Sequence, residues 1–322
     1  MVRMLACALL AASVVAVHGA QQARPPQEPE TSTFRAGSEI VRAYVTVTDK
    51  DGRLVTTLMK SDFELRDEGK VQPITIFDNS PRAIRLIVML DVSGSMEGNL
   101  PLLRAAAGQL VQRLRPDDGA RVGTFGKDVV ISPAFTRDAQ ELIASLPTTI
   151  DPDAPTPLWR AIEKATQSFG ERTGDARDVV LVLSDGKDSG FTGFKDRFVT
   201  QGDVIDRARR QDVMVYAIGM RSRGKPSVPG FGTAGLSAAL LADQPDPGLA
   251  RVAEESGGGY AEIKFGENLG EAFARVADEL HSQYLLGFDP PKKDGKVHEI
   301  QIKVTQAGLK PRARKDYVAP KG

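Results

Sequence analysis

Four short stretches of the chain are almost continuously apolar, and amphipathic segments lie between them. The apolar stretches span residues 86–90, 120–125, 179–183 and 213–218. Apolar residues at helical spacing follow the first stretch, at Leu103, Ala107, Leu110 and Leu114. Strands that are buried on both faces and alternate with helices form a parallel sheet with helices on both sides. The pattern therefore predicts a Rossmann-like, doubly wound α/β domain with a mostly parallel sheet over about residues 84–283.

Both flanks of this region show alternation of apolar and polar positions instead. Apolar side chains recur at every second residue from residue 41 to 47 and from residue 300 to 304, which is the period of a half-buried strand. Each flank alone is too short for a stable sheet, because isolated hairpins are marginal in water. We therefore predict one small β-sandwich formed by residues 36–82 and 284–318 together, with the α/β domain inserted between them.

Residues 1–20 have the layout of a secretory signal peptide, with Arg3, an apolar run and the small pair Gly19-Ala20. The apolar run is shorter than the roughly 20 residues that a membrane-spanning helix needs. The one cysteine, Cys7, has too little apolar sequence before it for a lipoprotein signal. Residues 21–35 are rich in Gln, Pro, Glu and Thr and are predicted to be a disordered tether. We expect an exported protein, secreted or periplasmic, without disulfides.

Composition narrows the classes of function. The chain has 42 basic and 42 acidic residues, whereas a nucleic-acid partner would demand an excess of Lys and Arg. One Cys and three His exclude zinc sites built from these residues and Cys nucleophiles. We expect His281 at a helix end and His298 on a strand surface, neither in a catalytic loop. From Pro291 onward nine Lys or Arg stand against three Asp or Glu, and we expect them to form a solvated basic face.

Side chains with oxygen atoms follow two of the predicted strands and precede one predicted helix. Asp91, Ser93 and Ser95 come directly after the first apolar stretch, and Asp185 comes after the third. Thr156 lies shortly before a helix. Ligands in open α/β sheets bind at the carboxyl ends of the strands. We therefore expect these five side chains to converge at one edge of the sheet.

Hydroxyl and carboxylate oxygens in this combination suit Mg²⁺, with Mn²⁺ as a substitute. Two carboxylates within about 5 Å of each other repel by roughly 3 kcal/mol at an effective dielectric constant of about 20, and a divalent cation reverses that repulsion. The competing interpretation makes Asp91 and Ser93 caps of the following helix. Three segments in the right order on the same edge favour a metal site.

These segments resemble the metal-ion-dependent adhesion site of the von Willebrand factor A domain family, and the resemblance covers about residues 84–283. The matching residues are Asp91-x-Ser93-x-Ser95, Thr156 followed by Pro157-Leu158, and Asp185-Gly186. The resemblance implies that the first three side chains and Thr156 line a divalent cation and that Asp185 often acts through water. It also implies that an acidic side chain of a protein partner completes the coordination shell.

The sequence departs from the family pattern in the loop before the threonine. Residues 151–155 contain Asp and Pro where the family often has glycines, and a stiffer loop would alter how readily Thr156 reaches the metal. The flanking β segments look like the extensions of exported bacterial proteins that carry this domain.

Two further patterns point elsewhere. Residues 230–235 match the GxGxxG nucleotide-binding pattern, but no strand precedes them. We expect a loop insertion at 221–246 that either shapes partner choice at the metal edge or only faces solvent. Asp91 at a strand end also fits a phosphatase that uses a carboxylate nucleophile, but Ser93 stands where such an enzyme needs a general acid.

The sequence thus predicts an exported, non-catalytic binding or adhesion module that captures a carboxylate of a protein partner through a divalent cation. The alternatives are a scaffolding protein with a purely structural metal and a Mg²⁺-dependent phosphoryl hydrolase. The last predicted helix runs almost directly into the strand that begins at Tyr284, so a shift of that helix on ligand binding would act on the β-sandwich. The partner and the oligomeric state stay open.

Overall fold

The computed structural model describes residues 40–171, 174–189, 198–221, 245–263 and 267–321. The predicted signal peptide and tether lie outside the described residues, as do the 230–235 pattern and most of the insertion predicted at 221–246. None of the described helices is long and apolar enough to cross a membrane. Residues Glu39–Gly322 belong to one compact unit.

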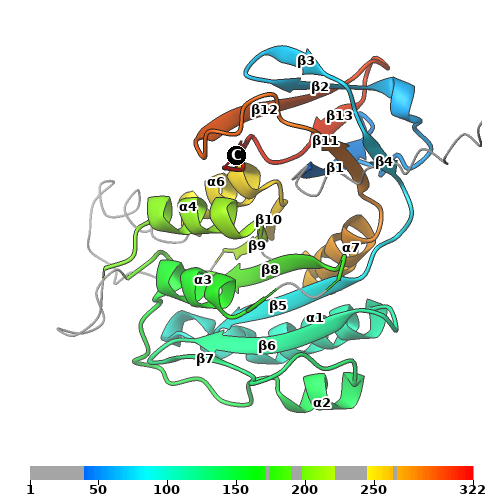
Figure 1. Cartoon of the computed structure of the whole chain (residues 1–322). Coiled ribbons are helices and arrows are strands. Elements are labelled where there is room, and N and C mark those ends of the chain that lie inside the picture. Colours follow the sequence, from blue (N-terminus) through cyan, green and yellow to red (C-terminus); the bar gives the residue numbers. More distant parts are fainter. Residues whose placement is uncertain (1–39, 172–173, 190–197, 222–244, 264–266, 322) are drawn as a thin grey trace, which may run out of the picture. The chain divides into compact units, whose positions relative to one another are not determined.

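A six-stranded sheet forms the centre of the α/β region, with the strand order β10-β9-β8-β5-β6-β7 (Figure 1). Its strands are β5 (Ile84–Asp91), β6 (Gly119–Phe125), β7 (Val129–Ile131), β8 (Arg177–Ser184), β9 (Met214–Met220) and β10 (Tyr260–Ile263). All neighbouring strands are parallel except β6 and β7. The arrangement confirms the predicted mostly parallel, doubly wound sheet. The short strands β7 and β10 are additions that the apolar pattern does not predict.

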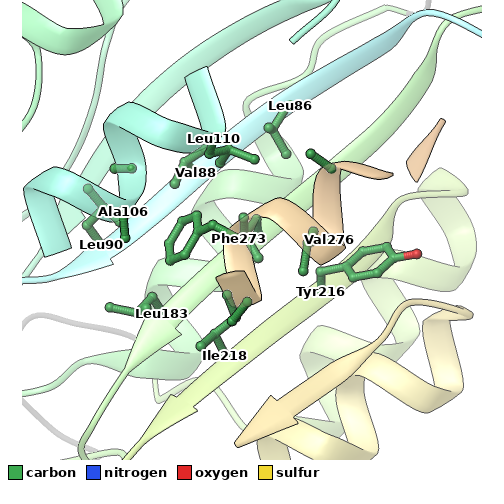
Figure 2. Close-up of a cluster of buried hydrophobic side chains, with 14 of the residues drawn as sticks. Leu86, Val88, Leu90, Ala106, Leu110, Leu183, Tyr216, Ile218, Phe273 and Val276 are labelled. Atoms are coloured by element: carbon green, nitrogen blue, oxygen red, sulfur yellow. The ribbon is translucent and has the colours of Figure 1, made fainter. Parts of the chain in front are cut away.

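Helices cover both faces of this sheet (Figure 1). One face carries α1 (Leu100–Arg113), α2 (Ala139–Ala144) and α7 (Leu269–Leu280), and the short 3₁₀ helix η2 (Gly94–Asn99) precedes α1. The other face carries α3 (Leu158–Gln167), α4 (Gln201–Gln211) and α6 (Gly248–Ser256). Figure 2 shows the core on the first face, where Phe273 of α7 lies among apolar side chains of α1, β5, β8 and β9.

Segments that precede and follow the α/β region form two four-stranded antiparallel sheets, ordered β13-β1-β11-β4 and β14-β12-β2-β3. The strands are β1 (Val41–Thr48), β2 (Phe63–Asp67), β3 (Lys70–Gln72), β4 (Ile76–Asp78), β11 (Tyr284–Phe288), β12 (Val297–Val304), β13 (Lys310–Arg312) and β14 (Asp316–Val318), with a 3₁₀ turn η1 at Lys60–Asp62. Side chains of both sheets, among them Leu65, Leu286 and Ile300, share one core. This arrangement confirms the predicted β-sandwich made from both flanks, while the domain boundaries proposed above stay predictions.

Strand β1 is buried on both faces, whereas its alternating pattern predicts one buried face. Val41, Ala43, Val45 and Val47 belong to the sandwich core. Tyr44 joins the core that α1 and α7 form with the central sheet, and Thr46 is only 1% exposed. The second face is covered because the α/β region packs against it.

Buried and half-buried polar side chains connect the end of α7 with β1 and β9, and we call Thr46, Arg177, Tyr216, Glu279 and Gln283 the α7 junction. Gln283 Nε2 donates to Thr46 Oγ1 at 2.8 Å and to the Tyr216 hydroxyl at 3.0 Å. The Glu279 carboxylate accepts from the Thr46 hydroxyl at 3.0 Å and from the Tyr216 hydroxyl at 2.5 Å. The guanidinium of Arg177 donates to Gln283 Oε1 and to the last carbonyl of α7. The junction therefore fastens α7 to the sandwich and to the central sheet at once.

Basic residues near the C-terminus pair with acidic residues of the α/β region. Arg312 pairs with Glu279, and Arg314 lies 2.8 Å from Asp212. Lys315 lies 3.3 Å from a carboxylate of α6. The prediction of a solvated basic face is wrong for Arg312 and Arg314, which this segment places against acidic side chains of distant elements, whereas Lys315 is 55% exposed to solvent.

His298 is buried, although we expected it on a strand surface. Its side chain is 5% exposed, and its ring nitrogens lie 3.2 Å from Asp67 Oδ1 and 3.2 Å from Asp294 Oδ1. The Tyr317 hydroxyl donates to the same Asp67 oxygen at 2.8 Å. The surface prediction for His298 is therefore wrong, because this side chain belongs to a polar cluster inside the sandwich.

Candidate metal centre

The candidate site lies at the carboxyl ends of the neighbouring strands β5 and β8. Asp91 is the last residue of β5, and Asp185 directly follows β8. The two strands pair in parallel, so both aspartates reach the same edge of the sheet. Both residues are buried, with Asp91 0% and Asp185 1% exposed.

Hydroxyl groups link the segments that carry the two carboxylates. Ser93 Oγ lies 3.1 Å from Ser95 Oγ, and Ser95 Oγ donates to Asp185 Oδ1 at 2.7 Å. Asp91 Oδ1 accepts from the backbone amide of Ser93 at 2.8 Å. The structure therefore brings four of the five predicted site residues into one hydrogen-bonded cluster.

Thr156, the fifth residue, lies beside this cluster. A Cβ atom placed on Gly186 would be only 3.0 Å from Thr156 Oγ1, so the hydroxyl faces the turn that follows Asp185. The loop that precedes Thr156 packs on the first segment, since the Gly94 amide donates to the Ala154 carbonyl at 3.2 Å. The loop that departs from the family pattern thus still leaves Thr156 against the turn that follows Asp185 and close to the segment that carries Ser93 and Ser95.

The side chain of Ser93 does not cap the helix that follows it. Ser93 is the N-cap residue of η2, but its side chain makes no capping hydrogen bond. By contrast, Asp138 accepts from two backbone amides at the start of α2, and Thr200 accepts from an amide at the start of α4. The geometry therefore disfavours the capping interpretation of this segment.

Burial makes the ionised form of Asp91 unfavourable. Burial is the largest effect and, together with repulsion from Asp185, it raises the pKa of Asp91 from 3.8 to about 7. Hydrogen bonds from Ser184 and Ser93 oppose this rise. A buried carboxylate beside a second carboxylate is stabilised in its ionised form by a nearby cation.

The donor set fits a small, hard cation. It consists of three hydroxyls and two carboxylates, and Mg²⁺ and Mn²⁺ prefer oxygen ligands. Across the described ranges, no group of three or more His, Cys, Asp or Glu side chains could hold a metal ion. Hydroxyls would therefore supply most of the protein ligands here. The negative charge of the two carboxylates together does not exceed the positive charge of a divalent cation. A further carboxylate from outside could join such a site.

Neither described histidine lies at this site. His281 Nε2 is 2.8 Å from Asp118, and Asp118 also accepts from the amide of Ile84 at the start of β5. The length of β5, roughly 20 Å, separates that end from Asp91. His281 does lie at the end of α7, as expected, and His298 is in the sandwich.

Two serines that the sequence pattern does not single out bond to site residues, and a nearby aspartate bonds to the helix that follows Thr156. Ser184 Oγ donates to Asp91 Oδ2 at 2.5 Å. Ser189 Oγ accepts from the Thr156 amide at 3.1 Å, and Asp188 Oδ1 accepts from an amide in the first turn of α3 at 3.2 Å. Serine and aspartate after a buried strand have no distinctive spacing, so only the fold reveals these partners.

Comparison with known families settles the identity of the α/β region. The model of the von Willebrand factor type A domain matches residues 86–237. This chain contains a von Willebrand factor type A (VWA) domain. Such a domain is an adhesion and protein-interaction module. No curated protein matches the sequence.

Solved structures with a similar fold include other VWA proteins. A VWA protein from Catenulispora acidiphila is 12% identical, with a TM-score of 0.45 over 89% of this chain and 76% of that chain. An aerotolerance-related membrane protein from Bacteroides fragilis is 15% identical, with a TM-score of 0.42 over 61% and 98%. The pilus adhesin SpaC from Lactobacillus rhamnosus GG is 10% identical, with a TM-score of 0.44 over 79% and 43%.

Proposed function

We propose that the VWA domain captures a carboxylate of a protein partner through Mg²⁺ or Mn²⁺ held at the candidate metal centre. Asp91, Ser93, Ser95 and Thr156 would line the cation, and Asp185 would act on it directly or through water. A Glu or Asp side chain of the partner would complete the shell. The bound cation supplies the positive charge that attracts this carboxylate.

One observation carries the proposal, namely the hydrogen-bonded chain from Ser93 through Ser95 to Asp185, with Asp91 and Thr156 beside it. This series of hydrogen bonds joins segments that are far apart in the sequence. Neither described histidine lies at the site. Among the described residues no histidine bonds to these hydroxyls, the arrangement that activates a serine or threonine nucleophile, and this favours binding over catalysis. The donor set thus supports a non-catalytic role.

Calorimetry of Mg²⁺ binding tests the metal site. Wild-type protein should bind Mg²⁺, and Asp91→Ala should lose measurable binding because it removes a buried anionic ligand. At about 100 times its dissociation constant, Mg²⁺ should add about 2.7 kcal/mol to the free energy of unfolding of the wild type only. Asp128→Ala is a matched control, since Asp128 is an exposed carboxylate just after β6, at the same sheet edge. Equal Mg²⁺ affinity in wild type and Asp91→Ala would disprove the site.

Affinity capture with and without EDTA tests the partner chemistry. A partner held through the cation should be lost in EDTA, return with Mg²⁺, and fail to bind after its contacting Glu or Asp is changed to Gln or Asn. Capture that survives EDTA while the protein stays folded would support the scaffolding alternative. Mg²⁺-dependent release of phosphate from a generic aryl phosphate would support the hydrolase alternative.

We also propose that the protein acts outside the cytoplasm, on the strength of the signal-peptide pattern in residues 1–20. The mature protein should appear in the periplasm or the medium and should begin near residue 21. Cell fractionation followed by N-terminal sequencing checks this expectation. An uncleaved chain retained in the cytoplasm would contradict it without affecting the metal site.

A further inference from the structure

The end of β8 and the residues that follow it contact every other segment of the candidate metal centre, and we call residues 184–189 the hub segment. Ser184 is 0% exposed and is the last residue of β8. Its hydroxyl donates to Asp91 Oδ2 at 2.5 Å and accepts from the Gly186 amide at 3.2 Å. One hydroxyl therefore joins the Asp91 carboxylate to the backbone of the turn that carries Asp185.

Ser189, at the end of the hub segment, hydrogen-bonds to both the amide and the carbonyl of Thr156. The Thr156 amide donates to Ser189 Oγ at 3.1 Å, and the Ser189 amide donates to the Thr156 carbonyl at 2.9 Å. These two bonds fix the position of Thr156 without using its hydroxyl. The hydroxyl therefore remains available to a cation.

The middle of the hub segment anchors two helices. Asp188 Oδ1 accepts from the Trp159 amide in the first turn of α3 at 3.2 Å. The Asp188 amide donates to Asp246 Oδ2 at 3.1 Å, and Asp246 Oδ1 accepts from the Gly248 amide at the start of α6 at 2.8 Å. A displacement of this segment would therefore be resisted at several points.

We propose that the hub segment is the positioning element of the metal centre, in which Ser184 orients the Asp91 carboxylate and Ser189 places Thr156. The inference rests on the proposed function, because positioning matters only if these groups bind a ligand. Neither serine belongs to the predicted ligand set. Both act through another residue, as the hydrogen-bonded groups behind metal ligands do.

Calorimetry of Mg²⁺ binding to serine variants of the full chain tests the proposal. Ser184→Ala should weaken Mg²⁺ affinity by about 10- to 100-fold, the usual effect of losing an outer hydrogen bond to a metal ligand. Ser189→Ala removes one part-buried neutral hydrogen bond and should weaken affinity by about two- to tenfold. Ser256→Ala is the matched control, since Ser256 Oγ accepts from the Val215 amide of the same sheet at 3.0 Å but touches no site residue.

The control separates positioning from general stability. Each variant removes a hydroxyl that bonds to backbone or carboxylate near the sheet, so each should lower the free energy of unfolding in EDTA. Only the two hub variants should also change Mg²⁺ affinity. If Ser184→Ala and Ser189→Ala bind Mg²⁺ as tightly as Ser256→Ala, the positioning role is refuted even though the metal site stands.

Amide hydrogen exchange in EDTA gives a second readout that needs no metal. Exchange should quicken at the amides of residues 91–96 in Ser184→Ala and at the Ala154, Thr156 and Leu158 amides in Ser189→Ala, while the control leaves both sets unchanged. Wild-type protein that binds neither Mg²⁺ nor Mn²⁺ would overturn the proposed function and the positioning role with it, whereas wild-type binding combined with unchanged exchange in both hub variants would overturn the positioning role alone. If Ser184→Ala does not fold, Ser189→Ala decides, because its side chain is exposed.

Discussion

Gly94 is the residue at which two loops of the site come closest together. A Cβ atom at this position would lie 1.9 Å from the Pro152 carbonyl oxygen, which is far inside van der Waals contact. Any side chain here must therefore push the loop that precedes Thr156 away from the loop that follows Asp91. A glycine in the pattern DxSGS reflects this close approach rather than an unusual backbone angle.

Gly94→Ala should therefore lower the free energy of unfolding by about 1–3 kcal/mol, the usual range for overpacking a close contact. It should also weaken Mg²⁺ affinity, because Thr156 moves away from the other ligands. Gly98→Ala serves as the control, since a Cβ atom there meets nothing within 4 Å. Chemical denaturation and calorimetry check both expectations. Similar behaviour of the two variants would show that the loops part without cost.

The raised pKa of Asp91 predicts how stability depends on pH in the metal-free protein. Asp91 keeps its proton up to about pH 7 in the folded state, whereas the unfolded chain releases it near 3.8. Between these values the folded state binds more protons, so the free energy of unfolding should fall as the pH rises from about 4 to about 7. Saturating Mg²⁺ should remove this contribution, because the cation stabilises the ionised carboxylate.

Denaturation in EDTA at several pH values, compared between wild type and Asp91→Asn, measures the effect. Asparagine does not titrate, so the difference between the two proteins isolates Asp91 from other groups such as Asp118. Burial acts to raise the pKa of Asp118, but hydrogen bonds from His281 and from the backbone together outweigh burial and lower it. In EDTA, the difference in free energy of unfolding between wild type and Asp91→Asn should change with pH. In Mg²⁺, that difference should stay constant. A difference that does not change with pH in EDTA would contradict the raised pKa.

At the scale of elements, one carboxylate near the end of α7 accepts hydrogen bonds from both β1 and β9. Glu279 accepts from Thr46 and Tyr216, which are each 1% exposed, and pairs with Arg312. Glu279→Ala should lower the free energy of unfolding by about 1–3 kcal/mol, because buried hydroxyls lose their acceptor. Glu271→Ala on the same helix should change it by less than about 0.5 kcal/mol, since that side chain is 68% exposed. If urea denaturation gives equal losses of unfolding free energy for the two variants, the α7 junction contributes little to stability.

The long strands could be predicted because each is a run of apolar residues buried on both faces. The four-residue strand β10 carries no such run, and its burial depends on β9. The surface prediction for His298 could have been avoided, because His298 has the same parity along β12 as Ile300 and therefore points into the sandwich. The partners of Arg312 and Arg314 could not be foreseen, since they belong to elements distant in the sequence.

The five candidate ligands could be selected from the sequence because strand ends and chain order constrain where they lie. The structure adds what spacing cannot give, namely that Ser95 bonds to Asp185 and that Ser184 bonds to Asp91. These pairs depend on the register between β5 and β8, which only the assembled sheet fixes. The sequence predicts which side chains come together at this edge of the sheet but not the hydrogen-bonded groups that position them.

At the scale of the whole molecule, the VWA domain and the sandwich should unfold together. Tyr44 of β1 lies in the core of the α/β region, and the α7 junction and the Arg314–Asp212 pair cross between the two parts. The single tryptophan, Trp159, reports on α3, and amide exchange along β12 reports on the sandwich. Both probes should give the same midpoint in urea. A sandwich that opens at a clearly lower urea concentration would disprove this coupling.

The pairing of β1 with β11 also sets the order in which the chain can fold. Thr46 and Gln283, which bond to each other, are 237 residues apart. Contacts between distant residues form slowly. Because β1 precedes the α/β region in the chain and β11 follows it, β1 is synthesised first and cannot pair with β11 until the α/β region has been made. During that wait its apolar side, which ends in the sandwich core, is open to other chains. Substitutions that slow folding of the VWA domain should therefore promote aggregation through β1, a strand that they do not touch.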